Sequence, residues 1–195
     1  ALILRQGLFG ENAVLSNALV EMYAKCGWLG KAQEIFDKLP VRDVVSWNVL
    51  ISEYSKHDEG QKALVCFKQM QINGVSPNVV TFIGILKACG SLGAIQKGNE
   101  VHAEIARKGF LEKDLAIGNA LIDMYAKRGL LAKAHEVFEK LPMKDVITWT
   151  TLIGGYARHE FAEDALACYV KMKLKGFSPN AITLISSLRA CSTVR

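Results

Sequence analysis

The stretch NALVEMYAKCG, residues 17–27, returns 102 residues later as NALIDMYAKRG, residues 119–129. When residues 11–93 are laid over residues 113–195, 36 of the 83 aligned positions are identical. All four prolines of the chain fall into two matched pairs at the same offset. Agreement on this scale does not arise by chance, so the chain contains an internal duplication.

A shorter period lies within the long one. Units that close at an Asp or at a PN dipeptide are 31, 35 and 36 residues long, and one set of three fills the long period. The full units are 13–43, 44–78, 79–114, 115–145 and 146–180, with partial units at 1–12 and 181–195. A length of 195 residues would ordinarily indicate one or two globular domains. The repeats instead predict a single array over 1–195, with no internal linker.

Each unit is predicted to contain two helices, as residues 44–78 illustrate. Apolar residues recur there at spacings of three and four, which is typical of amphipathic helices. We expect helices over Val45–His57 and Gln61–Ile72, with Gly60 in the turn and Gly74 as the helix stop. One helical hairpin cannot bury its apolar faces alone. The units are therefore predicted to stack into an all-α solenoid.

A helical projection at about 100° per residue separates two faces on the first helix of each unit. In unit 44–78, Trp47, Leu50, Ile51 and Tyr54 share one broad apolar face. The opposite stripe carries a small apolar residue, a short polar residue and a cation in four of the units: Val14, Asn17 and Lys25; Val45, Asn48 and Lys56; Ala116, Asn119 and Lys127; Ile147, Thr150 and Arg158. Stacking of the units would turn these trios into a continuous row.

Such a row has the chemistry for single-stranded RNA. Cations suit a phosphodiester backbone, and Asn and Thr can exchange hydrogen bonds with a base edge. Repeat proteins read RNA in this way, one base per repeat. Two interpretations stay open at this point, because Lys25 and its counterparts are also compatible with ordinary solvated helix residues, and Asn17 and Asn119 with helix caps. Unit 79–114 breaks the pattern, with Ile83 and Ser91 in place of the polar residue and the cation.

Other classes of protein find little support in the sequence. The net charge of +5 permits a polyanionic partner without demanding one. The five cysteines include no CxxC pair, so we expect reduced, apolar thiols and no metal site. His102 and Glu104 form an HxE triplet, but the CxxC of a zinc deaminase does not follow. We therefore predict that the chain is not an enzyme and needs no cofactor. We also predict no membrane span, since no apolar run approaches about 18 residues.

The units closely resemble pentatricopeptide repeats of the plant PLS subclass. NALVEMYAKCG (17–27) resembles the S motif, VVSWNVLISEY (44–54) the P motif, and VVTFIGILKACGSLGAI (79–95) the L motif. Units 13–43 and 115–145 are then S repeats, 44–78 and 146–180 are P repeats, 79–114 is an L repeat, and 1–12 and 181–195 are partial L repeats. The resemblance implies a right-handed α-solenoid superhelix. Tetratricopeptide repeats keep a steadier period of about 34 residues, which disfavours them.

This resemblance implies binding of single-stranded RNA in plant mitochondria or chloroplasts, within a specificity factor for C-to-U RNA editing. In the family, the fifth and the last residue of a motif select one base together. The base-specifying pairs would be Asn17 with Asp43, Asn48 with Asn78, Asn119 with Asp145, and Thr150 with Asn180. Ile83 with Asp114 lies outside the usual code. The implied target is 5′-U-C-N-U-A-3′.

The resemblance also implies contacts beside the base. The second residues of neighbouring motifs would sandwich it: Val14, Val45, Val80, Ala116, Ile147 and Ile182. Phosphates would meet Lys25, Lys56, Lys127 and Arg158. The main alternative is a protein-binding α-solenoid scaffold that takes small editing-factor proteins through its L repeat. The chain reads as a fragment, and we expect apolar surface near Ala1–Leu8 and Ala181–Val194 that favours end-to-end self-association.

Overall fold

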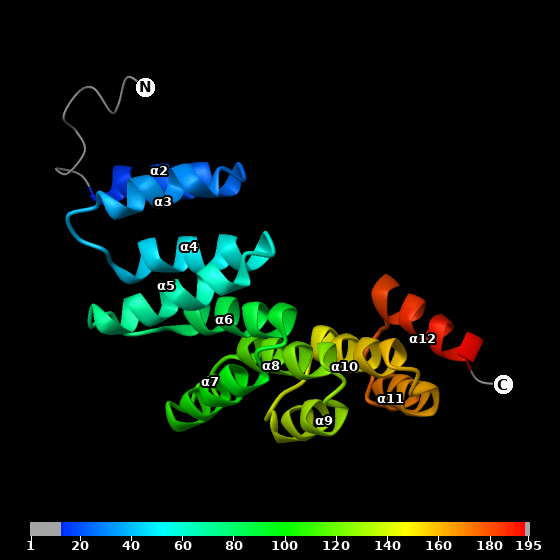
Figure 1. Cartoon of the computed structure of the whole chain (residues 1–195). Helices are drawn as coiled ribbons and strands as arrows, with labels where there is room; N and C mark the ends of the chain where they lie inside the picture. Colours follow the sequence, from blue (N-terminus) through cyan, green and yellow to red (C-terminus); the bar gives the residue numbers. More distant parts are fainter. Residues whose placement is uncertain (1–12, 194–195) are drawn as a thin grey trace. The chain divides into compact units, whose positions relative to one another are not determined.

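The structure is a computed structural model that describes residues 13–193, and every regular element in that range is an α-helix (Figure 1). The predicted partial unit 1–12 and the segment Ala1–Leu8 lie outside the described residues. The chain forms two compact units, one through Ala88 and one from Cys89, and the boundary falls within α6 (Val79–Leu92).

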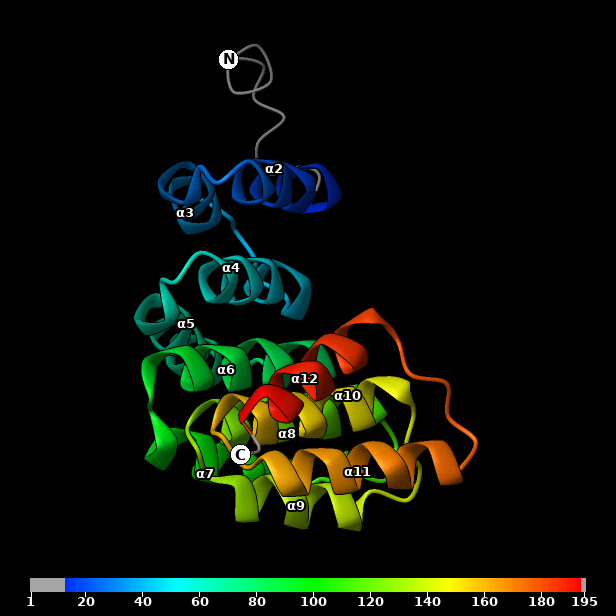
Figure 2. The ribbon, with the colours of Figure 1, turned by 90° about the vertical axis from the view of Figure 1, so that its right-hand side faces the viewer.

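The first unit is built from helical hairpins. Helices α2 (Ala13–Lys25) and α3 (Leu29–Asp37) pack together, as do α4 (Val44–Lys56) and α5 (Gly60–Ile72) (Figure 2). Helix α2 also packs against α4, so first helices stack on first helices.

The second unit repeats this arrangement. Its helices are α7 (Ile95–Arg107), α8 (Leu115–Lys127), α9 (Leu131–Lys140), α10 (Val146–Arg158), α11 (Ala162–Leu174) and α12 (Ala181–Thr193). Helix α10 packs against both α8 and α12, while α9 and α11 pack against their own hairpin partners. The predicted class, an all-α stack of helix pairs, is confirmed.

The apolar face predicted for the first helix of residues 44–78 is the buried face of α4. Trp47, Leu50, Ile51 and Tyr54 are all buried. The Trp47 ring meets the ring of Phe36 edge-on, with 4.6 Å between the centroids. The aromatic and branched residues of α4 thus fill the space between the two hairpins of the first unit.

The turn between α4 and α5 differs from the prediction in one respect. Gly60 was expected in the turn, but it is the first residue of α5 and is buried. Asp58 adopts the left-handed backbone instead, with φ of 57°, and its repeat counterpart Glu160 has φ of 65°. Asp tolerates this region better than most residues, and Glu160 shows that a longer side chain is also accepted, so the turn does not need glycine. Gly74 does end α5 in the left-handed region, at φ of 73°, as predicted.

A glycine lets two first helices approach closely in the second unit. A Cβ atom placed on Gly155 of α10 would lie 2.7 Å from the Cβ of Ala126 of α8. No real Cβ contact is that short. Glycine at this position therefore sets the spacing between α8 and α10.

Helix α12 exposes Ile182, Leu184, Ile185 and Leu188. Self-association through this apolar surface stays a prediction. None of the helices within residues 13–193 is long and apolar enough to cross a membrane.

Candidate functional site

The side chains of Asn48 and Asn78 meet at the N-terminus of α6. The Asn48 amide nitrogen donates to Asn78 Oδ1 at 3.0 Å. The hydroxyl of Thr81 donates to Asn48 Oδ1 at 2.6 Å. The helical projection places Asn48 opposite the apolar face of α4, and the structure shows that it is only 8% exposed there. The stacking of neighbouring first helices covers it, and its buried amide is satisfied by Asn78 and Thr81.

The pair Asn17 and Asp43 is also joined directly. The Asn17 amide nitrogen lies 3.3 Å from both carboxylate oxygens of Asp43. Asp43 is at the same time the N-cap of α4, where Oδ1 accepts the backbone N–H of Ser46 at 2.8 Å. One carboxylate therefore serves both the preceding first helix and the start of the next.

Thr150 and Asn180 are connected through a third residue. The hydroxyls of Thr150 and Thr183 share a hydrogen bond of 2.7 Å. The Thr183 hydroxyl also donates to Asn180 Oδ1 at 2.9 Å. Thr183 thus occupies the position that Thr81 occupies beside Asn48, one long period earlier.

Asn119 and Asp145 are arranged differently. Asn119 Oδ1 is buried and accepts no hydrogen bond from the described residues. Asp145 forms a capping box with Thr148 at the start of α10, where its Oδ1 accepts the Thr148 N–H at 2.7 Å. This pair therefore differs from the other three, in which the fifth residue of the repeat is hydrogen-bonded.

Ile83 and Asp114 belong to different compact units. Ile83 is half-buried in α6. Asp114 caps α8, where Oδ1 accepts the N–H of Ala116 at 2.8 Å.

The six residues predicted to flank a base are all exposed. They are Val14, Val45, Val80, Ala116, Ile147 and Ile182. Exposed aliphatic side chains beside a polar pair offer an apolar surface to a flat ring.

A groove of about 350 Å³ in the second unit gathers one complete predicted set. Its lining includes the flanking residues Ile147 and Ile182, the polar residues Thr150 and Asn180, and the cation Arg158. Asp123, Ser186 and Arg189 also line it. The structure therefore brings together five side chains to which the family resemblance assigns one function.

Three of the four predicted phosphate-binding cations are ion-paired within their own helices. Lys25 lies 2.6 Å from Glu21, Lys56 lies 2.6 Å from Glu53, and Lys127 lies 2.7 Å from Asp123. The hydrogen bond and charge of Glu21 raise the pKa of Lys25.

Arg158 differs from these three lysines. Among the described residues it has no ion pair, and Gly155 stands where α4 has Glu53. Its guanidinium is exposed and lines the groove. Arg158 is thus the one of the four predicted cations that no described carboxylate pairs with.

Two sets of residues at the site were not predicted from the sequence. In four of the first helices the third residue is a serine or threonine, and its backbone N–H donates to the side chain of the residue that caps the helix. These residues are Ser46, Thr81, Thr148 and Thr183. An Asp or Asn followed three residues later by a Ser or Thr has the spacing of a capping box, and this pattern could have predicted them. The acidic partners of the lysines were also readable, because residues three or four apart on a helix are neighbours.

His102 and Glu104, the HxE triplet, have separate partners. His102 Nδ1 lies 2.9 Å from the Tyr125 hydroxyl, and Glu104 pairs with Lys108 at 3.0 Å. Burial lowers the pKa of His102. Within residues 13–193, no three His, Cys, Asp or Glu side chains are grouped to hold a metal ion.

Comparison with family models identifies the repeats. The model of the PPR repeat family matches residues 42–91 and 144–193, and that of the PPR repeat matches residues 14–44 and 119–146. The first of these models alone covers more than half of the chain.

Curated plant proteins are similar along nearly the whole chain. The putative pentatricopeptide repeat-containing protein At3g05240 of Arabidopsis thaliana is 40% identical over 97% of the chain, which spans 34% of that protein. The chloroplastic protein At1g08070 of the same plant is 42% identical over 94% of the chain, which spans 25% of that protein. The chain therefore spans about a quarter to a third of the length of these relatives.

Solved structures show the same fold. The maize protein PPR10, in a complex with an 18-nt psaJ RNA element, matches 97% of the chain with a TM-score of 0.80 at 21% identity; the chain covers 29% of it. The PPR domain of Arabidopsis thaliana protein-only RNase P 1, in complex with tRNA, matches 91% of the chain with a TM-score of 0.67 at 16% identity, and the chain covers 99% of it. The duplicated sequence, the stacked helical hairpins and the matches along both halves agree: the chain belongs to the pentatricopeptide repeat family.

Proposed function

We propose that the chain is a sequence-specific module for single-stranded RNA that contacts one base per repeat, with the target 5′-U-C-N-U-A-3′. The observation that carries this proposal is the groove of α10 and α12. Ile147 and Ile182 flank the polar pair Thr150 and Asn180 there, and Arg158 supplies a positive charge. A base needs an apolar surface for its faces, hydrogen-bonding groups for its edge and a cation for its phosphate.

The repeat lengths and motifs favour the PLS subclass and a role in specifying sites of C-to-U RNA editing. Several similar proteins carry the words chloroplastic or mitochondrial in their names, which supports an organellar location for this chain. We assign no catalytic step to the chain, which would supply specificity to an activity located elsewhere.

Fluorescence anisotropy tests the RNA proposal directly. A labelled single strand containing UCNUA should bind at low salt more tightly than a scrambled strand of the same composition. The matched protein control is Thr150→Asn, which keeps the groove but should lose the preference for A at the last base. Equal binding of the two strands by the unaltered chain would contradict the proposal.

A second candidate function is a protein-binding scaffold. The L repeat 79–114 favours it, since Ile83 and Ser91 replace the polar residue and the cation of the other units. The partner would be a small editing-factor protein. A pulldown that still recovers protein after nuclease treatment and recovers no RNA would favour this function over the first.

A further inference from the structure

A second cavity in the second unit shares no residue with the groove described above. It measures about 430 Å³ and lies between α9, α10 and α11. Its lining residues define what we call the Trp149 cleft: Phe138, Glu139, Pro142, Lys144, Trp149, Lys171, Lys175 and Phe177. Trp149 and Thr150 are consecutive on α10, so their side chains point about 100° apart. The helix therefore presents the groove on one side and the cleft on another.

The floor of the Trp149 cleft holds a buried donor without an acceptor. Trp149 is 2% exposed, and its Nε1–H has no hydrogen-bond partner among the described residues. The ring is fixed by Phe138, whose centroid lies 4.7 Å away in an edge-on arrangement, and by Phe177 at 6.3 Å. Buried polar groups are nearly always paired, so this indole calls for an acceptor that enters the cleft.

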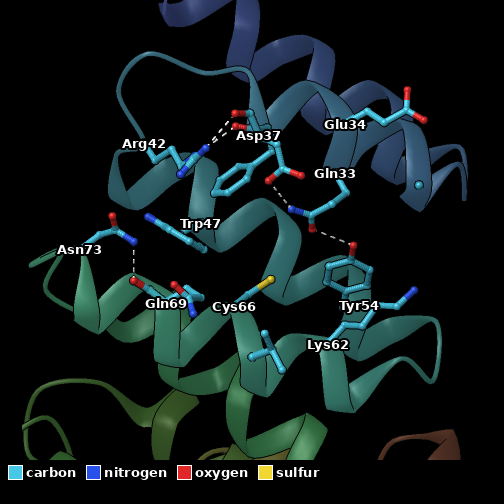
Figure 3. A pocket seen from close by; sticks show the side chains of 13 residues that line it. Gln33, Glu34, Asp37, Arg42, Trp47, Tyr54, Lys62, Cys66, Gln69 and Asn73 are labelled. Atoms are coloured by element: carbon cyan, nitrogen blue, oxygen red, sulfur yellow. Dashed lines mark hydrogen bonds between the residues drawn. The ribbon is translucent and has the colours of Figure 1, made fainter.

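The same arrangement recurs in the first unit. A cavity of about 550 Å³, the Trp47 cleft, lies at the repeat-equivalent position (Figure 3). Trp47 is 3% exposed, meets Phe36 edge-on at 4.6 Å, and also has an Nε1–H without a partner. In Figure 3 its indole nitrogen points to the end of the cleft where Arg42 and Asn73 lie. An unpaired donor that appears twice, 102 residues apart, is a feature of the repeat and not a local accident.

The two clefts differ in charge. Lys171 and Lys175 of the Trp149 cleft replace Gln69 and Asn73 of the Trp47 cleft. Three lysines and one glutamate line the Trp149 cleft, and Lys171 Nζ lies 3.3 Å from Glu139 Oε1. Lys144 Nζ donates to the Leu141 carbonyl at 3.0 Å and lies 5.0 Å from the centre of the Phe138 ring. The Trp149 cleft therefore combines an excess of positive charge with an unpaired N–H and aromatic walls.

We propose that the Trp149 cleft binds a glutamate or aspartate side chain from an acidic segment of a partner protein. A carboxylate accepts a hydrogen bond from the indole N–H and pairs with the surplus lysine charge. The methylene stem of the same side chain packs against Phe177, the aromatic lining residue that is only half-buried. A phosphate of RNA would also supply negative charge, and titration with uridine monophosphate separates the two sources.

The three tryptophans of the chain make the test direct, because each gives its own indole N–H signal in a proton–nitrogen NMR spectrum. The 15N-labelled 195-residue chain is titrated with N-acetyl-glutamate amide and, separately, with N-acetyl-glutamine amide. The Trp149 signal should shift and saturate with the glutamate compound and stay in place with the glutamine compound. Trp28, which is exposed and outside both clefts, is the internal control.

Two double variants test the role of the lysines. Each variant gives one cleft the residues that the other cleft carries at the same repeat positions. Lys171→Gln with Lys175→Asn should weaken the glutamate response of Trp149 by at least about threefold, the effect expected for losing two exposed charge pairs. Gln69→Lys with Asn73→Lys should give the Trp47 signal a response that it lacks in the unaltered chain. Far-UV circular dichroism checks that both variants keep their helical content.

Three outcomes would overturn the proposal. The first is a Trp149 signal that does not move with the glutamate compound. The second is an unchanged response in the Lys171→Gln, Lys175→Asn chain. The third is a stronger response to uridine monophosphate than to the glutamate compound, which would assign the cleft to nucleic acid. None of these outcomes depends on RNA binding in the groove, so the proposed function is tested separately.

Discussion

The hydroxyl of Thr81 donates a 2.6 Å hydrogen bond to the amide oxygen of Asn48, 33 residues earlier in the chain. The same hydroxyl accepts the backbone N–H of Asn78 at 3.1 Å. An amide whose oxygen is held in this way presents its N–H side to any other partner. Thr81 therefore orients the side chain that we propose to select the second base of the target.

Removing this hydroxyl should weaken discrimination more than affinity. In Thr81→Val the Asn48 amide keeps its hydrogen bond to Asn78 but loses the one that holds its oxygen, so it turns more easily to serve either pyrimidine edge. The preference for C over U at the second base should fall by about fivefold, which corresponds to the loss of one hydrogen bond of about 1 kcal/mol. Anisotropy with two RNAs that differ only at that base measures the ratio. Thr81→Ser keeps the hydroxyl and is the matched control; if valine and serine give the same ratio, Thr81 has no orienting role.

Exchanging the fifth residues of the two P repeats should exchange their base preferences. Asn48→Thr gives repeat 44–78 the Thr and Asn pair found at Thr150 and Asn180, so its preference should move from C toward A. Thr150→Asn should move the last base from A toward C. Competition binding with RNAs varied at one base reports both changes. An unaltered preference in both variants would disprove the proposed pairing.

The four predicted phosphate-binding cations should contribute unequally. Four contacts to a single strand would give a slope of log affinity against log salt of about −3. Arg158→Gln should reduce that slope by about 0.7, the contribution of one contact. Lys127→Gln should reduce it less, because Lys127 is already paired with Asp123 at 2.7 Å and must leave that carboxylate to meet a phosphate. Equal slopes for the two variants would show that the ion pair has no influence on binding.

Two adjacent glycines of α10 should respond oppositely to the same change. A Cβ on Gly155 would overlap Ala126 at 2.7 Å, so Gly155→Ala should lower the free energy of unfolding by about 1–3 kcal/mol. On Gly154 the nearest atom is Ser186 Oγ at 3.6 Å, an ordinary contact. Gly154→Ala should therefore raise the free energy of unfolding by about 0.5–1 kcal/mol, since alanine is the better helix former. Urea unfolding compares them; a destabilised Gly154→Ala chain would contradict the reasoning.

Much of the fold could be predicted from the sequence because the repeat supplies the same helical pattern many times. The spacing of Trp47, Leu50, Ile51 and Tyr54 gave the buried face of α4 correctly. The turn between α4 and α5 was predicted to within one residue, and only Gly60 was assigned wrongly. A pattern of apolar residues does not show that Asp58 takes the left-handed backbone.

The candidate site was harder to foresee. A projection of one helix placed Asn48 opposite the apolar face but could not show its burial, since the helix that covers it comes from the next repeat. Whether a lysine is free or paired with Glu53 depends on side-chain conformations, which a list of residue types does not contain. The unpaired N–H of Trp149 depends on the packing of three helices and leaves no trace in the sequence alone.

The last residue of a repeat caps the next helix and is also proposed to select a base, and this combination limits which substitutions it tolerates. Asp43, Asp145, Asn78 and Asn180 each accept the backbone N–H of a residue three positions later and so begin the next helix. Only Asp, Asn, Ser, Thr and Gly start helices well, and replacing such a cap by alanine costs about 1 kcal/mol. A change of RNA target, by evolution or by design, is therefore restricted to these few residue types at the last position of each repeat. The need to start the next helix thus limits which bases a repeat can be made to select.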